Sequence, residues 1–159
     1  HPEYPDEGKP RSSLEQKYGP GVQGHTQRVI EAAGLTYNPS QTLPNTLHAL
    51  QVTELARDRG LHEPVHTRLM HAYWSEARDL TDDETLLDLV VEAGLDRDEA
   101  STVLAEGPYA ERIAASTQEA NRLGIYAIPA FILGGRLVIM GAQPEELFEQ
   151  AVEQLAGAA

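Results

Sequence analysis

The sequence contains no cysteine in its 159 residues. This absence excludes a disulfide framework and, for the residues at hand, any chemistry performed by a thiol. Structural disulfides accumulate in oxidising compartments, so a chain without them is expected in the cytoplasm. Any thiol that the protein uses has to come from another segment or from another molecule.

A run of about 18 apolar residues is also missing, so the sequence predicts no membrane-spanning helix. Basic residues are scarce: 12 Lys and Arg stand against 25 Asp and Glu, the formal net charge is -13, and no basic cluster offsets it. Such a charge repels nucleic-acid phosphates and anionic lipid surfaces. We therefore expect neither a nucleic-acid partner nor a membrane partner, and one soluble globular domain with a sizeable core.

The sequence lacks an initiator methionine and the charged-then-apolar start of a signal peptide. We interpret it as a segment preceded by further residues. Its first stretch, "HPEYPDEGKPR" at 1–11, holds three prolines and a glycine among charges, which predicts a loop. The stretch "LTYNPSQTLP" at 35–44 is expected to be a connection with a short extended piece at 35–37.

Short helices with clear start and stop signals make up most of the chain. The expected helices are 12–19, 22–33, several between 45 and 106 in a bundle-like layer, 108–123, and one that begins at Pro144. Thr81 with Glu84, and Asp96 with Glu99, are predicted capping boxes, in which a short polar residue and an acid three positions later bond each other's backbone N–H.

The string "HEPVH", His62 to His66, matches a metalloprotease pattern that requires both histidines on one continuous helix. Pro64 stands between them, and proline fits the first helical position better than the interior. We therefore expect the helix to begin at Pro64, with His62 outside it and no zinc site. Tyr73 and Trp74 could line a ligand pocket, but their place on an apolar stripe favours core packing.

The clearest strand signal is "YAIPAFILGGRLVIMGAQPEEL" at 126–147. Two apolar runs flank Gly134 and Gly135, which supply the positive φ angles of a tight hairpin turn. Pro129 stands at the first position of the first strand, where its missing N–H removes no ladder bond. The helix from Pro144 is expected to pack on this hairpin. Long helix, proline-led strand, hairpin and helix follow the order of the second half of a thioredoxin fold.

These residues resemble a known family. The stretch 119–155, "EANRLGIYAIPAFILGGRLVIMGAQPEELFEQAVEQL", is similar to the end of the DsbA-like thioredoxin-fold oxidoreductases, in particular the FrnE-type branch. That branch runs A-x3-G-[VI]-x-G-[VI]-P-x-F, a hairpin, S-G-A-Q-P and an amphipathic helix. Further elements match upstream in the same order, "HPEYPDEG", "PNTLHAL" and "LMHAYWSEARDLTDDETLLDLVVEAGLD", so the resemblance covers nearly the whole chain.

The resemblance implies an α/β, thioredoxin-like fold interrupted by an all-helical insertion. The thioredoxin-like domain would comprise residues 1–41 and 107–159, and the insertion residues 42–106. The N-terminal βαβ part, which carries the C-x-x-C redox motif, would be absent from these residues and lie upstream of His1. Without that part we expect the hairpin to keep an unpaired strand edge and an uncovered apolar face.

The implied activity is thiol–disulfide exchange, as an oxidoreductase or isomerase that acts on disulfide- or thiol-containing proteins or small molecules. Ile128, Pro129 and Ala130 would bind substrate, because the backbone before the proline receives an extended peptide as an added strand. Pro129 would also keep metal ions away from the dithiol. We expect no catalytic residue and no metal ligand among the residues given, and no cofactor except glutathione as a redox partner.

The chain departs from the family pattern at four positions. Ala127 replaces a frequent Gly and Ala130 a frequent Thr or Ser, which changes the polarity of the proline loop. Leu50 and Gln51 replace a His-Arg pair, so that a polar pair becomes apolar and neutral. The oligomeric state and the direction of exchange are left open by the sequence.

Two other functions stay open. A related branch, the 2-hydroxychromene-2-carboxylate isomerases and kappa-class glutathione transferases, binds glutathione at the same proline loop. It usually shows G-x-D-R-L after the hairpin, where this chain has "GAQPEEL", which favours the oxidoreductase. A non-catalytic thioredoxin-like binding module is the third reading, and the absence of cysteine is its main support.

Overall fold

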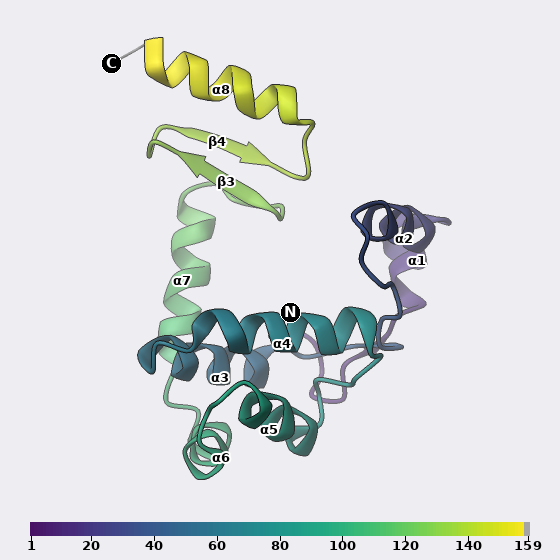
Figure 1. The fold of residues 1–159 in the computed structure, drawn as a ribbon, viewed down its shortest axis with the longest axis vertical. Helices are drawn as coiled ribbons and strands as arrows, with labels where there is room; N and C mark the ends of the chain where they lie inside the picture. The colour runs from purple at the N-terminus through teal and green to yellow at the C-terminus, as the bar shows by residue number, and fades with distance from the viewer. Residues whose placement is uncertain (158–159) are drawn as a thin grey trace. The chain divides into compact units, whose positions relative to one another are not determined.

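The computed structural model describes residues 1–157, which form two compact units, one of His1–Ile113 and one that begins at Ala114. Figure 1 shows the course of the chain. Among residues 1–157, none of the helices combines the length and the hydrophobicity that a bilayer crossing requires. Each unit is described by itself below.

The first unit is almost entirely helical. Its elements are β1 Lys9–Pro10, α1 Ser13–Tyr18, α2 Val22–Ala32, β2 Thr42–Leu43, α3 Leu47–Asp58, α4 His62–Ser75, α5 Asp83–Glu92, α6 Arg97–Glu106 and the first turn of α7 Ala110–Arg122. The short antiparallel pair of β1 and β2, with Lys9 opposite Leu43, replaces the loop expected at the start of the chain. The extended piece expected at 35–37 is not a strand.

The core of this unit lies between α3, α4, α5 and α6, which lie close together in Figure 1. On α3 the buried residues Val52, Leu55 and Ala56 follow the i, i+3, i+4 spacing of one helix face. Fully buried side chains of the other helices meet them, among them Val65, Leu86, Leu89, Val90 and Ala100. The amphipathic patterns between residues 45 and 106 therefore predicted the bundle-like layer correctly.

Two aspartates cap the helices α5 and α6. The Asp82 carboxylate accepts from the backbone N–H of Thr85 at 3.0 Å, so the cap of α5 lies one residue after the expected Thr81. Thr81 instead donates to Asp79. The Asp96 carboxylate accepts from the N–H of Glu99 at 2.9 Å, which is one half of the expected capping box, whereas the Glu99 carboxylate pairs with Arg59. Carboxylates suit these sites because free N–H groups and the positive end of the helix dipole meet there.

The start of α4 differs from the expectation. The helix begins at His62, and Pro64 is its third residue rather than its first. The first turn tolerates proline because its N–H groups have no acceptor within the helix. His62 and His66 consequently lie on one helix face with their rings stacked, 5.6 Å between centroids.

The second unit holds the antiparallel hairpin of β3 Ala130–Leu133 and β4 Leu137–Met140. Gly134 and Gly135 have φ angles of 56° and 66°, in the left-handed region that the turn requires. The hairpin expected from the sequence is confirmed, including its turn.

Helix α8, Glu145–Gly157, packs on one face of this hairpin, as expected. The ring of Phe148 meets that of Phe131 edge to face, with 4.9 Å between centroids. At the turn, a Cβ on Gly134 would lie 3.4 Å from the Leu155 side chain, so the helix also approaches the end of the hairpin. Leu147, Phe148, Ala151, Val152 and Leu155 form the apolar stripe from which this packing was predicted.

Two adjacent valines of α5 test the placement of the core. Val90 is 0% exposed and Val91 is 40% exposed. We expect Val90→Ala to lower the free energy of unfolding by about 2 kcal/mol, because methyl groups are lost and a cavity is left. Val91→Ala should change it by less than about 0.5 kcal/mol. Urea unfolding followed by circular dichroism measures both values, and equal losses would show that the buried face of α5 is wrongly placed.

Candidate substrate-binding site

The segment that leads into β3 is strongly exposed. Ile128 is 87% exposed and Tyr126 85% exposed, although both carry large apolar groups. The peptide bond between Ile128 and Pro129 is cis, and the carbonyl of Pro129 accepts from the N–H of Gly141 at 2.7 Å. Ala130 is the first residue of β3 and is half-buried. The three residues expected to bind substrate are thus continuous, and the first of them projects into solvent.

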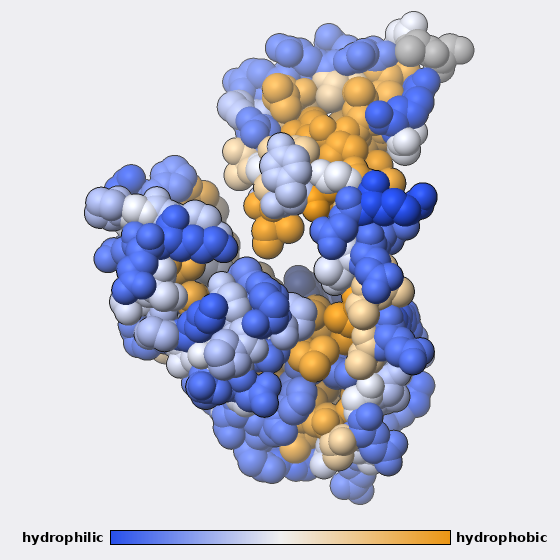
Figure 2. All heavy atoms as spheres, turned by 180° about the vertical axis from the view of Figure 1, so that it is seen from behind, coloured by the Kyte–Doolittle hydropathy of each residue, from blue (hydrophilic) through white to orange (hydrophobic). Residues whose placement is uncertain are grey.

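Beyond this segment, the hairpin presents an open edge and an open face. Among the residues that the structure describes, β3 pairs with β4 alone, so its other edge keeps backbone groups for a further strand. Residues opposite each other on paired strands share a face. Phe131 and Ile139 face α8, whereas Ile132 and Val138 on the second face are 48% and 43% exposed. Figure 2 shows hydrophobic side chains gathered over this unit.

The chain has no cysteine, and no group of three or more His, Asp or Glu side chains in residues 1–157 could hold a metal ion. His62 and His66 share a helix face, yet the Nε2 of His62 lies 3.0 Å from the guanidinium of Arg57, a group that can only donate. Among residues 1–157, no third ligand accompanies the two histidines of the "HEPVH" string.

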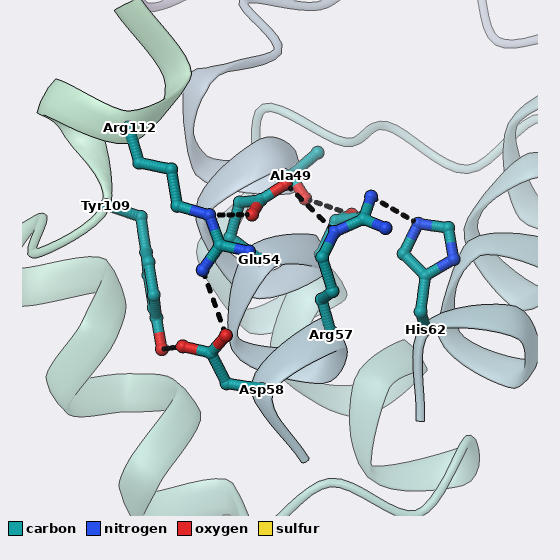
Figure 3. Close-up of polar contacts among 8 residues, drawn as sticks. Ala49, Glu54, Arg57, Asp58, His62, Tyr109 and Arg112 are labelled. Atoms are coloured by element: carbon teal, nitrogen blue, oxygen red, sulfur yellow. Dashed lines mark hydrogen bonds and ion pairs between the residues drawn. The ribbon is translucent and has the colours of Figure 1, made fainter. Parts of the chain in front are cut away.

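A cluster of polar side chains, Glu54, Asp58, Tyr109 and Arg112, joins α3 to the first turn of α7 (Figure 3). Arg112 lies 2.7 Å from the Glu54 carboxylate and 2.9 Å from the Asp58 carboxylate. The hydroxyl of Tyr109 donates to the second oxygen of Asp58 at 2.9 Å. Glu54 and Asp58 are one helical turn apart, which lets a single guanidinium reach both.

The charges of this cluster shift the pKa values of its members. The hydrogen bond from Arg112, followed by that from Tyr109, lowers the pKa of Asp58 because both stabilise the ionised carboxylate. Burial, followed by the hydrogen bond to Asp58, raises the pKa of Tyr109. The arrangement therefore holds charges in place and leaves Asp58 ionised.

Gln51 has a structural role that the sequence did not reveal. It is 2% exposed, and its side-chain oxygen accepts from the N–H of Tyr109 at 2.9 Å, at the entrance to α7. A side chain at Gly107, whose φ is 62°, would stand 3.3 Å from the Gln51 amide nitrogen. The departure from the family's His-Arg pair thus produces a buried connector. The place of Gln51 on one strip of α3 with Glu54 and Asp58 was the available signal.

Arg11 is a further residue that sequence reasoning missed. It is 4% exposed, its Nε donates to the carbonyl of Ser40, and its Nη2 donates to the hydroxyl of Tyr73. Its guanidinium also lies 5.1 Å from the ring centroid of Tyr73 and 5.4 Å from that of Trp74. Burial raises the pKa of Tyr73, which keeps its hydroxyl neutral. The two aromatic residues expected to be core packing therefore also enclose a cation.

Comparisons with known proteins give the wider context of this geometry. A match to the family described as "DSBA-like thioredoxin domain" spans residues 2–153. The crystal structure of a probable DsbA oxidoreductase from Streptomyces coelicolor is similar, with a TM-score of 0.84 and 32% sequence identity. The similarity covers 99% of this chain and 72% of that chain. No curated protein matches the chain.

These comparisons confirm the predicted resemblance and the predicted thioredoxin-like fold with a helical insertion. They are compatible with the FrnE-type branch without identifying it. The domain limits 1–41, 107–159 and 42–106, and the substrate-binding role of residues 128–130, stay predictions.

The Arg112 cluster yields a test by titration. We expect Arg112→Gln to raise the pKa of Asp58 toward the ordinary value of about 3.9, because the largest stabiliser of the carboxylate is gone. Tyr109→Phe should raise it less. Because the folded pKa is depressed, the stability that Asp58 contributes is present above the ordinary pKa and is lost as pH falls through the folded value.

Carbon-detected NMR titration of the Asp58 carboxylate measures these changes. Arg57→Gln is the control, because Arg57 pairs with Glu54 and has no recorded contact with Asp58. An Asp58 pKa that is the same in Arg112→Gln and in the unchanged protein would contradict the geometry.

Proposed function

This chain belongs to the DSBA-like thioredoxin domain family, and we propose that the protein is a thiol–disulfide oxidoreductase whose C-x-x-C motif lies on a segment upstream of His1. Membership of the family, together with the oxidoreductase from Streptomyces coelicolor, supports oxidoreductase activity in general terms. The narrower statements are our proposal. They are the FrnE-type branch, the upstream motif, a thiol- or disulfide-containing substrate and a cytoplasmic location.

The observation that carries the proposal is the open hairpin. The free edge of β3 and the exposed side chains of Ile132 and Val138 form a surface that a further strand and helix would cover. Covering such a surface is favourable, because apolar area leaves water and unpaired backbone groups find partners. A segment with one strand and one helix is also the unit that presents a C-x-x-C motif at a helix start, where the thiolate is stabilised.

The residues of the chain would act on the substrate by binding it. Ile128 offers an apolar side chain and backbone groups to an extended peptide, and Pro129 cannot compete for acceptors because it has no N–H. The reaction needs two sulfur atoms of the motif. One thiolate attacks a substrate disulfide, the other substrate sulfur leaves as a thiolate, and the second motif thiolate resolves the mixed disulfide.

In that direction the substrate gains two electrons and the motif becomes a disulfide. Glutathione is a candidate reductant that would return the motif to the dithiol. The reverse sequence oxidises a substrate dithiol, and the residues described here favour neither direction.

The first test is the intact mass and the thiol count in denaturant of the protein purified from its natural source. We expect a mass well above the 17.4 kDa of these residues and two or more thiols. We also expect the protein to catalyse reduction of insulin disulfides by dithiothreitol. A protein of 17.4 kDa without thiols would overturn the proposal in favour of the non-catalytic binding module.

The role of Ile128 has its own test. We expect Ile128→Glu to lower kcat/KM for insulin reduction by about tenfold, because a charge replaces an apolar contact worth on the order of 1.5 kcal/mol. Val91→Glu is the matched control. It places the same charge at an exposed valine of α5 and should alter kcat/KM by less than about twofold. Equal effects of the two variants would show that Ile128 does not contact the substrate.

A further inference from the structure

A cavity of about 420 Å³ lies within the first unit, between the end of α2 and one side of α4. Its apolar wall comes from Ile30 and Leu35 on one side and from Met70 and Trp74 on the other. Its volume falls in the range of about 300–1,000 Å³ that is usual for small-molecule sites. None of the residues that line the cavity belongs to the hairpin, and no step of the proposed oxidoreductase activity uses them.

The two walls are joined by hydrogen bonds. The segment after α2 binds the last turn of α4, where the N–H of Asn38 donates to the carbonyl of Trp74 at 2.7 Å and the N–H of Ala77 donates to the carbonyl of Asn38 at 2.9 Å. The hydroxyl of Ser75 donates to the carbonyl of Thr36 at 2.9 Å. The cavity therefore has a defined shape before any ligand binds, which lowers the entropy lost on binding.

The charge around the cavity contrasts with that of the rest of the protein. The sequence holds 25 acidic residues, yet none of the residues that line the cavity is acidic, and two of them are histidines, His66 and His71. The Nδ1 of His71 lies 2.8 Å from the Glu76 carboxylate, and Glu76 is in turn held by Arg68. His66 makes a ring stack with His62 and has no ion pair among the described residues.

A buried cation adds to this contrast. Trp74, which lines the cavity, has the guanidinium of Arg11 5.4 Å from its ring centroid. Arg11 is 4% exposed and, within residues 1–157, its partners are a carbonyl, a hydroxyl and two aromatic rings rather than a carboxylate. A buried charge without a counter-ion is screened little by solvent, so it favours a negative charge nearby.

We infer that this cavity binds a small apolar monocarboxylate of the medium-chain fatty-acid type. The hydrocarbon chain would contact Leu35, Met70 and Trp74, and the carboxylate would face His66. A neutral ligand would gain only the apolar contacts, and an ammonium would find no carboxylate among the residues that line the cavity. The preference for an anion is what separates this site from an unselective hydrophobic cleft.

Trp74 provides the readout, because it is the single tryptophan of the sequence. Its fluorescence is followed while octanoate, 1-octanol or octylammonium is added to the whole protein, and calorimetry measures the same affinities. We expect octanoate to bind about tenfold more tightly than 1-octanol, as a charge-assisted hydrogen bond exceeds a neutral one by roughly this factor. Octylammonium should bind more weakly than either. Trp74→Phe should abolish the fluorescence change, which ties the signal to this residue.

Variants at the exposed rim residue Leu35 test the charge preference without disturbing the core. We expect Leu35→Glu to weaken octanoate binding about fivefold and Leu35→Lys to strengthen it, because each variant places a charge at the rim of the cavity that would hold the carboxylate. Val91→Glu, the same charge change outside the cavity, should change the affinity by less than about twofold.

Three outcomes would overturn the inference. Equal binding of octanoate and 1-octanol would show a cleft without preference for an anion. An unchanged affinity in Leu35→Glu would place the carboxylate elsewhere. No response to octanoate up to about 1 mM would show that the cavity is not a ligand site. None of these outcomes bears on the insulin-reduction assay. The oxidoreductase proposal and this inference can therefore fail independently of each other.

Discussion

The rotation of α3 about its own axis is the constraint on which the first unit depends. One strip of this helix, Val52, Leu55 and Ala56, lies in the core against the other helices of the layer. A second strip, Gln51, Glu54 and Asp58, holds the first turn of α7 by a buried amide and two carboxylates. Both strips follow from the same backbone, so a turn of the helix by about 100°, the angle between neighbouring residues, would lose both sets of contacts at once. Apolar burial alone would tolerate small rotations, since cores accept repacking, whereas hydrogen bonds and ion pairs depend on direction and fix the angle.

The two most deeply buried polar side chains with long-range contacts, Gln51 and Arg11, solve the same physical problem in different ways. Burying a polar group costs free energy unless the group finds hydrogen-bond partners. Gln51 meets the backbone N–H at the start of α7, a donor that has no acceptor within its own helix. Arg11 meets a carbonyl, a hydroxyl and two ring faces, which satisfy its donors and leave its charge without a carboxylate. Among the described residues, no buried side-chain nitrogen or oxygen lacks a partner. The two side chains thus differ in charge, since Gln51 is neutral and Arg11 is a cation without a carboxylate partner among the described residues.

Local features could be predicted from the sequence. Features that depend on contacts between residues far apart in the sequence could not. Gly134 and Gly135 identify the hairpin because they alone fit the turn angles, and the stripe of α8 follows from a simple period. Helix starts were less certain: Thr81 and Asp82 are both capping residues, and Pro64 is tolerated at several positions of a first turn. The pair of β1 and β2 joins two short segments about thirty residues apart, and no local pattern marks it. The roles of Arg11 and Gln51 were equally hidden, since their partners lie 62 and 58 residues away in the sequence.

Two isoleucines of the same hairpin region bear on the binding role that we propose for the second unit. Ile139 is 7% exposed under α8, whereas Ile128 is 87% exposed in the segment before β3. Burying such a side chain contributes about 1.5–3 kcal/mol, so the chain gains this energy at Ile139 and forgoes it at Ile128. Ile132 and Val138 are partly exposed as well, and they adjoin a strand edge with unpaired backbone groups. An incoming strand could form backbone hydrogen bonds with the open edge and bury apolar surface against these side chains. Neither interaction needs a reacting atom from this chain. The absence of cysteine is therefore consistent with a chain that supplies recognition, while the sulfur chemistry proposed for the protein comes from a different segment.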